Sequence, residues 1–121
     1  YIGHRTDIPS LMTMADFQVQ PSISGEGLPR TIIEAMANAT PSVVTTTGGS
    51  PELVVDGKTG FIAEAGNVQE FADAMNKLIN NKELIQSMSI AAQQRLDNEF
   101  HAQNTIKEHL AFFNKLLIEI Y

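Results

Sequence analysis

Residues 21–37 read PSISGEGLPRTIIEAMA, a glycine-containing loop that continues into a segment with an apolar stripe. Pro29 suits the first turn of a helix, because the N–H that it lacks would have no partner there. The helix is predicted over residues 29–39. Its apolar face comprises Ile32, Ile33, Met36 and Ala37. Before the loop, residues 16–21 alternate in apolar character and predict a short strand. The stretch is therefore a strand, a loop and a helix in direct succession.

Strand and helix patterns continue on both sides of this stretch. A helix opens at Asp7, and short apolar runs predict strands at residues 42–45 and 61–63. The segments with helical spacing are one or two turns at 50–54 and longer helices at about 67–80, 82–98 and 102–119. Alternating strands and helices build parallel sheets with crossover helices. We therefore predict an α/β fold, a Rossmann-like three-layer domain with a parallel sheet and extra C-terminal helices that cover it or cross to a neighbour.

Composition limits the class of protein and of partner. The 121 residues are 43% hydrophobic and 18% charged, as in soluble globular proteins, and predict a single domain over residues 1–121. No apolar run reaches the ~20 residues of a membrane span. The net charge of −6 argues against a nucleic-acid partner. There is no Cys, and the three His residues have no metal-ligand spacing, so no metal site is expected.

The chain begins at Tyr1-Ile2-Gly3 without an initiator Met. An apolar pair followed by Gly predicts the end of a strand at this position. We interpret the chain as part of a longer protein. The alternative is a natural start after processing.

The loop between the first strand and the next helix has the chemistry of an anion site. Gly25 and Gly27 permit close approach of the backbone to a ligand. The N–H groups of Arg30, Thr31 and Ile32 are predicted to be free at the helix start, where the helix dipole also favours negative charge. In open sheets, ligands bind beyond the carboxyl ends of the strands, which is where this loop lies. The loop could therefore hold a diphosphate on an acidic protein, although many such junctions bind nothing.

Two carboxylates accompany the predicted anion site. Glu34 lies about 7 Å along the helix, where a carboxylate can accept hydrogen bonds from the two hydroxyls of a ribose. The alternative is an ion pair with Arg30, which in this order would stabilise the helix by only a few tenths of a kcal/mol. Glu26 lies on the loop between two Gly residues and can reach a ligand, or it can serve as a turn or capping acid. Gly48-Gly49 is first of all a turn, which could also line the cleft.

The ordered set of motifs resembles a known family. Seven residues separate Glu26 from Glu34, which opens Glu34-Ala35-Met36-Ala37. The motifs that follow are Pro41, Val43-Val44-Thr45, Gly48-Gly49, Pro51-Glu52-Leu53-Val54, Asp56-Gly57 and Thr59-Gly60. The lead-in comprises Gly3-His4-Arg5-Thr6-Asp7-Ile8-Pro9 and Ala15-Asp16. Together they resemble the C-terminal, donor-binding domain of glycosyltransferase family 4, retaining enzymes of group 1 type with the GT-B fold. The resemblance covers nearly the whole chain.

The resemblance implies a role for each matching residue. Glu26 would be the catalytic residue that contacts hydroxyls of the transferred sugar, and Glu34 would bind the ribose. Tyr1, Ile2 and Gly3 would lie near the base. The implied donor-binding residues are Gly25, Glu26, Gly27, Leu28, Pro29, Arg30, Thr31 and Glu34. One departure is Ala39, which stands where the family usually has Gly and predicts an altered helix end.

The resemblance also implies a function. The donor-binding domain would serve a hexosyltransferase that moves sugar from a nucleoside-diphosphate sugar to an acceptor, in cell-surface polysaccharide or glycolipid synthesis, with no metal or other cofactor. Its partners would be the donor and its own N-terminal acceptor domain, which the sequence lacks. We expect a cytoplasmic location, with a peripheral position at the inner face of the membrane left open. Without the acceptor domain the chain is predicted to be inactive. The alternatives are a non-catalytic nucleotide-sugar-binding or scaffold module, and another nucleotide-sugar enzyme.

Overall fold

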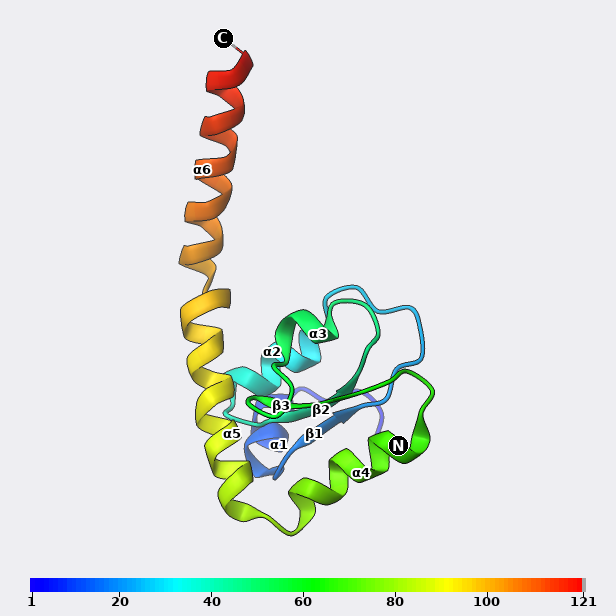
Figure 1. Cartoon of the computed structure of the whole chain (residues 1–121). Coiled ribbons are helices and arrows are strands. Elements are labelled where there is room, and N and C mark those ends of the chain that lie inside the picture. Colours follow the sequence, from blue (N-terminus) through cyan, green and yellow to red (C-terminus); the bar gives the residue numbers. More distant parts are fainter. Residues whose placement is uncertain (121) are drawn as a thin grey trace.

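The computed structural model describes residues 1–120 and contains a three-stranded parallel sheet (Figure 1). Its strands are β1 (Gln18–Gln20), β2 (Ser42–Thr45) and β3 (Gly60–Ala63), in the order β1-β2-β3. Val19 pairs with Val43, and Val43 pairs with Phe61. The predicted α/β class with a parallel sheet is confirmed. β1 lies at one edge of this sheet, next to β2.

Helices cover both faces of the sheet. They are α1 (Ile8–Met14), α2 (Arg30–Ala37), α3 (Ser50–Leu53), α4 (Val68–Ile79), α5 (Lys82–Arg95) and α6 (Ala102–Ile120), with a π-helical turn at Leu96–Phe100. Figure 1 shows α2 and α3 above the sheet and α4 below it. The predicted three-layer arrangement is therefore confirmed, because α2 in the crossover from β1 to β2 lies on one face of the sheet and α4 lies on the other.

The core consists of two apolar clusters, one on each face of β2. Val44 packs with Ile32 and Leu53 on the α2 face, and Val43 packs with Leu78 and Met88 on the α4 face. All four residues of β2 are buried, as expected for a central strand of a parallel sheet that is covered on both sides. Helix α5 joins the clusters, since its Met88 belongs to one and its Ala92 to the other.

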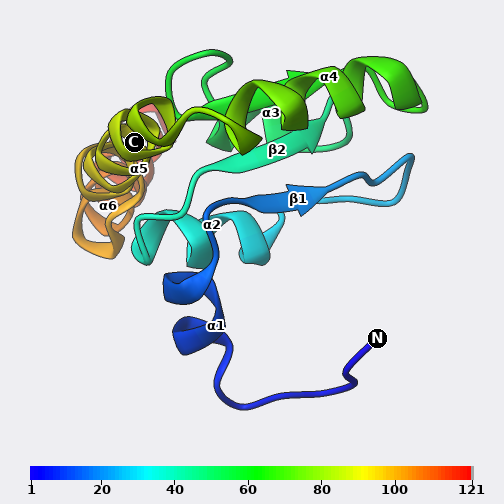
Figure 2. The same cartoon turned by 90° about the horizontal axis from the view of Figure 1, so that it is seen from below.

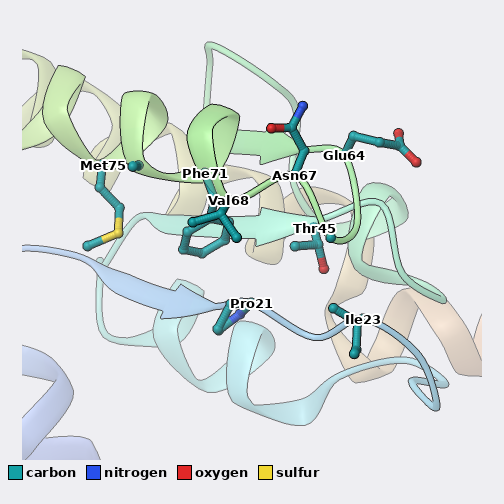
Figure 3. Close-up of a pocket in the computed structure, with 10 residues that line it drawn as sticks. Pro21, Ile23, Thr45, Glu64, Asn67, Val68, Phe71 and Met75 are labelled. Atoms are coloured by element: carbon teal, nitrogen blue, oxygen red, sulfur yellow. The ribbon is translucent and has the colours of Figure 1, made fainter.

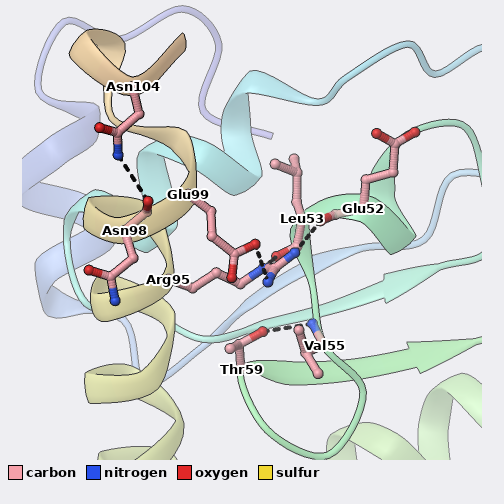
Figure 4. A network of polar contacts seen from close by, with 8 residues as sticks. All are labelled: Glu52, Leu53, Val55, Thr59, Arg95, Asn98, Glu99 and Asn104. Atoms are coloured by element: carbon pink, nitrogen blue, oxygen red, sulfur yellow. Dashed lines mark hydrogen bonds and ion pairs between the residues drawn. The ribbon is translucent and has the colours of Figure 1, made fainter. Parts of the chain in front are cut away.

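Arg95 ties the end of α5 to α3 (Figure 4). Its Nε donates to the Leu53 carbonyl at 3.1 Å, and its Nη2 donates to the Glu52 carbonyl at 2.7 Å. Its Nη1 also lies 2.6 Å from Glu99 Oε2. The guanidinium thus satisfies carbonyls at the C-terminus of α3, which have no partner within so short a helix. The π-helical turn that follows brings Leu96 and Phe100 against the core.

The end of α2 is formed with alanine in a left-handed conformation. Ala39 has a φ of 53° and is the one non-glycine residue with positive φ in the described part of the chain. Its N–H donates to the Met36 carbonyl at 3.1 Å, and the Thr40 N–H donates to the Ala35 carbonyl at 2.9 Å. These two bonds make a Schellman motif. The altered helix end that the sequence predicts does not occur, because Ala39 itself adopts the conformation that glycine favours.

The two ends of the chain differ from the sequence-based expectation. Tyr1, Ile2 and Gly3 are exposed and belong to no strand, so the predicted strand end is wrong. A strand needs a neighbour with which its backbone pairs, and residues 1–3 pair with none of the three described strands. Helix α6 forms where it was predicted, but it projects from the body (Figure 1), so of the two predicted arrangements the one in which it covers the sheet does not occur, and its apolar residues at 106, 110, 113 and 117 are exposed. None of the helices within residues 1–120 combines the length and the apolar character of a membrane span.

Candidate functional site

The loop at residues 21–29 connects the carboxyl end of β1 to the start of α2. Figure 2 shows the arrowheads of β1 and β2 pointing toward the end of the sheet from which this loop extends. The helix begins at Arg30, one residue later than predicted, and Pro29 occupies the capping position before it. The predicted position of the loop is therefore correct. It lies beyond the carboxyl ends of parallel strands, where ligands usually bind.

Hydrogen bonds attach the loop to the turn that follows β2. The Ser22 carbonyl accepts from Thr45 Oγ1 and, at 2.8 Å, from Thr47 Oγ1. At the other end of the loop, the Gly49 N–H donates to the Gly27 carbonyl at 2.6 Å. Both contacts join segments more than twenty residues apart in the chain. They hold the loop in one conformation even though most of its residues are exposed.

Gly48 and Gly49 make this close approach possible. A Cβ atom at Gly48 would lie 2.2 Å from the Glu26 carbonyl oxygen, and one at Gly49 would lie 2.9 Å from the Gly27 carbonyl oxygen. Gly48 also has a φ of 56°, which glycine adopts without strain. The two glycines thus pack directly against the backbone of Glu26 and Gly27, in addition to forming a turn.

Glu26 is held by side chains, and only one of its two carboxylate oxygens is used. Oε1 accepts from Gln20 Nε2 at 3.0 Å and from Ser22 Oγ at 2.6 Å. Among residues 1–120, no backbone N–H donates to the Glu26 carboxylate. The structure therefore does not support a capping role for this half-buried side chain, and Oε2 is available to a ligand.

The sequence-based reasoning missed Gln20 and Ser22 as partners of Glu26. A signal for Gln20 was present in the strand pattern. Strands of a parallel sheet covered on both faces are usually continuous apolar runs, whereas Gln18 and Gln20 interrupt this one. Two amides on the same face of such a strand indicate a polar network. Nothing in the local pattern around Ser22 indicates its contact with Glu26.

The start of α2 presents two open backbone amides. No acceptor for the Arg30 or the Thr31 N–H is present in the part of the chain that the structure describes. The third amide predicted to be free is not, because the Ile32 N–H donates to the Pro29 carbonyl at 3.2 Å. The correction arises because the first turn tightens and closes an i to i−3 bond, which a sequence pattern does not reveal.

Glu34 has no side-chain partner within residues 1–120. The ion pair with Arg30, which was the alternative to ligand binding, does not form there. Asn38 approaches Glu34 through the backbone carbonyl instead, with Nδ2 at 2.8 Å. The residue is partly exposed, and its carboxylate oxygens are not among the buried polar atoms that lack a partner in the described residues, so water can solvate them. The carboxylate is thus open to a ligand, and its contact with a ribose stays a prediction.

An apolar cavity of about 270 Å³ lies beside the loop, on the α4 face of the sheet (Figure 3). Pro21 and Ile23 line it from the loop, and Phe71 and Met75 line it from α4. Glu26 and Glu34 do not line it. Its walls are mainly apolar, with Thr45, Glu64 and Asn67 as polar members, so it is separate from the polar groups around Glu26.

Two other predictions concern the surroundings of the loop. No set of three His, Asp or Glu side chains in the described part of the chain could hold a metal ion. The expectation that the reaction needs no metal stays a prediction. Tyr1, Ile2 and Gly3 lie in the exposed N-terminal coil, and Figure 2 shows the N-terminus apart from the sheet. Their role near a base also stays a prediction.

The chain is similar to glycosyltransferases in sequence and in structure. The capsular polysaccharide biosynthesis glycosyltransferase CapM of Staphylococcus aureus is 34% identical over 94 residues, which are 78% of this chain and 25% of CapM. HepE of Anabaena, solved with UDP, is 33% identical with a TM-score of 0.82, over 91% of this chain and 31% of that one. A glycosyltransferase of Rickettsia africae is 27% identical with a TM-score of 0.83, over 94% and 31% of the two chains.

These relatives are longer than the chain, which spans about a quarter to a third of their length. The solved structures match most of the chain. The model of the family described as glycosyl transferases group 1 matches residues 1–95, which include the whole candidate site from Gln20 to Glu34. The chain therefore belongs to the glycosyl transferases of group 1.

Proposed function

We propose that the chain binds a nucleoside-diphosphate sugar and forms the donor-binding part of a retaining hexosyltransferase. The observation that carries this proposal is the solvent-accessible Glu34 carboxylate, which lacks a side-chain partner in the described residues, on the same helix as the open amides of Arg30 and Thr31. A single ligand that carries a diphosphate and a ribose would satisfy both.

The diphosphate would bind at the start of α2. The Arg30 and Thr31 amides point out of the first turn, where the helix dipole adds a partial positive charge. Arg30 also contributes an exposed guanidinium without an ion pair among residues 1–120. The net charge of −6 repels an anionic ligand, so such a ligand must be held by donors that lie close to it, as these do.

The two carboxylates would bind hydroxyl groups on either side of the diphosphate. Glu34 is one helical turn beyond the open amides, within reach of the ribose hydroxyls. Glu26 would accept hydrogen bonds from the transferred sugar through Oε2, with the backbone of residues 25 and 27–29 lining the same loop. Glu26 is therefore the proposed catalytic residue. Tyr1, Ile2 and Gly3 are the proposed base region.

The relatives support this choice of ligand. HepE was solved with UDP and with UDP-glucose, and CapM is named for capsular polysaccharide biosynthesis. We infer that the longer protein transfers a hexosyl group in cell-surface polysaccharide or glycolipid synthesis. Its acceptor would bind to an N-terminal domain, and we propose a cytoplasmic location with peripheral contact to the membrane through that domain.

Titration of the 15N-labelled chain with UDP and UDP-glucose tests the proposal. We expect backbone NMR shifts at Gly25, Gly27, Arg30, Thr31 and Glu34, and smaller shifts elsewhere. UDP-glucose should shift the loop residues more than UDP does, because only UDP-glucose carries a sugar for Glu26. A spectrum that does not change at these positions with uridine, guanosine or adenosine diphosphate sugars would contradict the proposed function.

A further inference from the structure

Gln20 joins three elements of the candidate site through its side-chain amide. Its Nε2 donates to Glu26 Oε1 on the loop at 3.0 Å. Its Oε1 accepts from Thr31 Oγ1 on the first turn of α2 at 2.5 Å. The same oxygen accepts from the neighbouring Gln18 Nε2 at 3.3 Å. The amide is therefore held at both of its ends.

The chemistry of these partners allows one orientation of the Gln20 amide. The Glu26 carboxylate can only accept, so it selects the NH₂ end of Gln20. The NH₂ group of Gln18 can only donate, so it selects the oxygen end. Rotating the amide by half a turn would set oxygen against carboxylate. The network extends into the protein, because Gln18 Oε1 accepts from the buried Ser42 Oγ at 3.1 Å.

This arrangement restrains a carboxylate that would otherwise rotate freely. Glu26 lies between Gly25 and Gly27, so its immediate neighbours have no side chains to confine it. Gln20 and Ser22 both bind Oε1, and Oε2 has no partner in the described residues. With Oε1 held in place, Oε2 is directed away from the network.

We propose that Gln20 is a positioning residue that aims Glu26 Oε2 at the donor sugar. This inference rests on the proposed function, in which Glu26 contacts the sugar and the Thr31 amide contacts the diphosphate. It adds that one amide on β1 connects the two contacts. Recognition of the sugar should therefore depend on Gln20, whereas recognition of the nucleotide should not.

Gln20→Met tests this separation, because it keeps the length of the side chain and removes the amide. The dissociation constants of UDP and UDP-glucose are measured by NMR titration of the full 121-residue chain. Gln20→Met removes the bonds to Glu26, Thr31 and Gln18, of which only the bond to Glu26 positions the sugar contact. We therefore expect the affinity for UDP-glucose to fall about fivefold, and that for UDP to change by less than about twofold.

The matched control is Gln69→Met on α4. Gln69 Nε2 donates to Asp73 Oδ1 at 2.9 Å, so the control removes the same kind of bond away from the candidate site. Thr31→Val is the second variant, should Gln20→Met fail to fold. It removes the hydroxyl that holds Gln20 Oε1 and should lower the affinity for UDP-glucose in the same direction.

A readout without ligand follows the contact itself. Relative to the wild-type chain, Glu26→Gln should shift the side-chain NH₂ resonances of Gln20. Gln20→Met should shift the resonance of the Glu26 carboxyl carbon. Unchanged resonances, or an equal loss of UDP and UDP-glucose affinity in Gln20→Met, would overturn the positioning role. A wild-type chain that binds neither ligand would overturn the proposed function, and the role of Gln20 at a donor site with it.

Discussion

At the scale of single residues, Glu34 has a carboxylate that is open to solvent and has no side-chain partner in the described chain. Glu34→Gln should weaken UDP binding by about ten- to a hundredfold, because hydrogen bonds to a charged group are worth about 1.5–3 kcal/mol. The unfolding midpoint should change little, since no contact of the carboxylate is lost. Titration with UDP and urea unfolding measure the two effects. The control is Glu108→Gln on the exposed α6, and equal UDP affinities in the two variants would contradict the prediction.

Gly48 is a second residue at which one added carbon atom should change the stability of the fold. Gly48→Ala would place a Cβ atom 2.2 Å from the Glu26 carbonyl oxygen. The matched control is Gly57→Ala, because Gly57 also has positive φ, at 73°, but no atom within 4 Å of an added Cβ. We expect Gly48→Ala to lower the free energy of unfolding by about 1–3 kcal/mol more than the control. It should also shift the NMR signals of residues 25–28, and a loop left unchanged would contradict the close approach.

At the scale of elements, the end of α2 carries a strained alanine. Ala39→Gly should raise the free energy of unfolding by about 1 kcal/mol. The substitution removes the strain of a left-handed alanine, which is about 1–2 kcal/mol, but glycine loses more backbone entropy on folding, which cancels part of this gain. Ala37→Gly, two residues earlier in the helix, is the control and should lower stability by about 0.5–1 kcal/mol. Chemical denaturation measures both. Equal signs for the two substitutions would show that Ala39 is not strained.

At the scale of the whole molecule, the body and α6 differ in their packing. The side chains of residues 105–118 are exposed, whereas Leu96 and Phe100 pack against the core. A chain that ends at residue 101 should therefore keep nearly the full stability, since the hydrogen bonds that residues 103–105 make to Asn98 and His101 lie at the start of the exposed helix. A chain that ends at residue 95 should lose about 2–4 kcal/mol. Urea unfolding of the two truncated chains measures the difference, and coinciding midpoints would contradict this division.

The chain alone is expected to be inactive. A leaving diphosphate develops negative charge that needs electrostatic stabilisation, and the segment from Gln20 to Glu34 contains one basic residue, Arg30. We expect no release of UDP from UDP-glucose above the rate without protein, with water or with sugar acceptors, even where NMR shows that the donor binds. A coupled assay for UDP measures this. Transfer to any acceptor would contradict the prediction, and the longer protein serves as the positive control.

The local patterns sufficed for the order of elements and for the place of the site. Periods of about two and 3.6 residues lie within one element, and they predicted strands at 16–21 and 42–45 and helices at 29–39 and 102–119, which the structure has at 18–20, 42–45, 30–37 and 102–120. They gave a wrong strand end at residues 1–3 and did not reveal that the apolar face of α6 is exposed, because both depend on what lies beside the segment. Neither the pairing of a strand nor the burial of an apolar helix face is encoded within the segment itself.

The sequence by itself determined a group 1 glycosyltransferase fold and two acidic residues, Glu26 and Glu34, on either side of a helix start. Only the tertiary structure decided that Gln20 and Ser22 hold Glu26, whereas Glu34 has no side-chain partner in the described residues. Gln20 meets Glu26 and Thr31, and Gly49 meets Gly27, because the register of β1 on β2 and the path of the loop bring distant segments together. Hydrogen bonds act over about 3 Å, so these partners follow from three-dimensional packing and not from spacing along the chain.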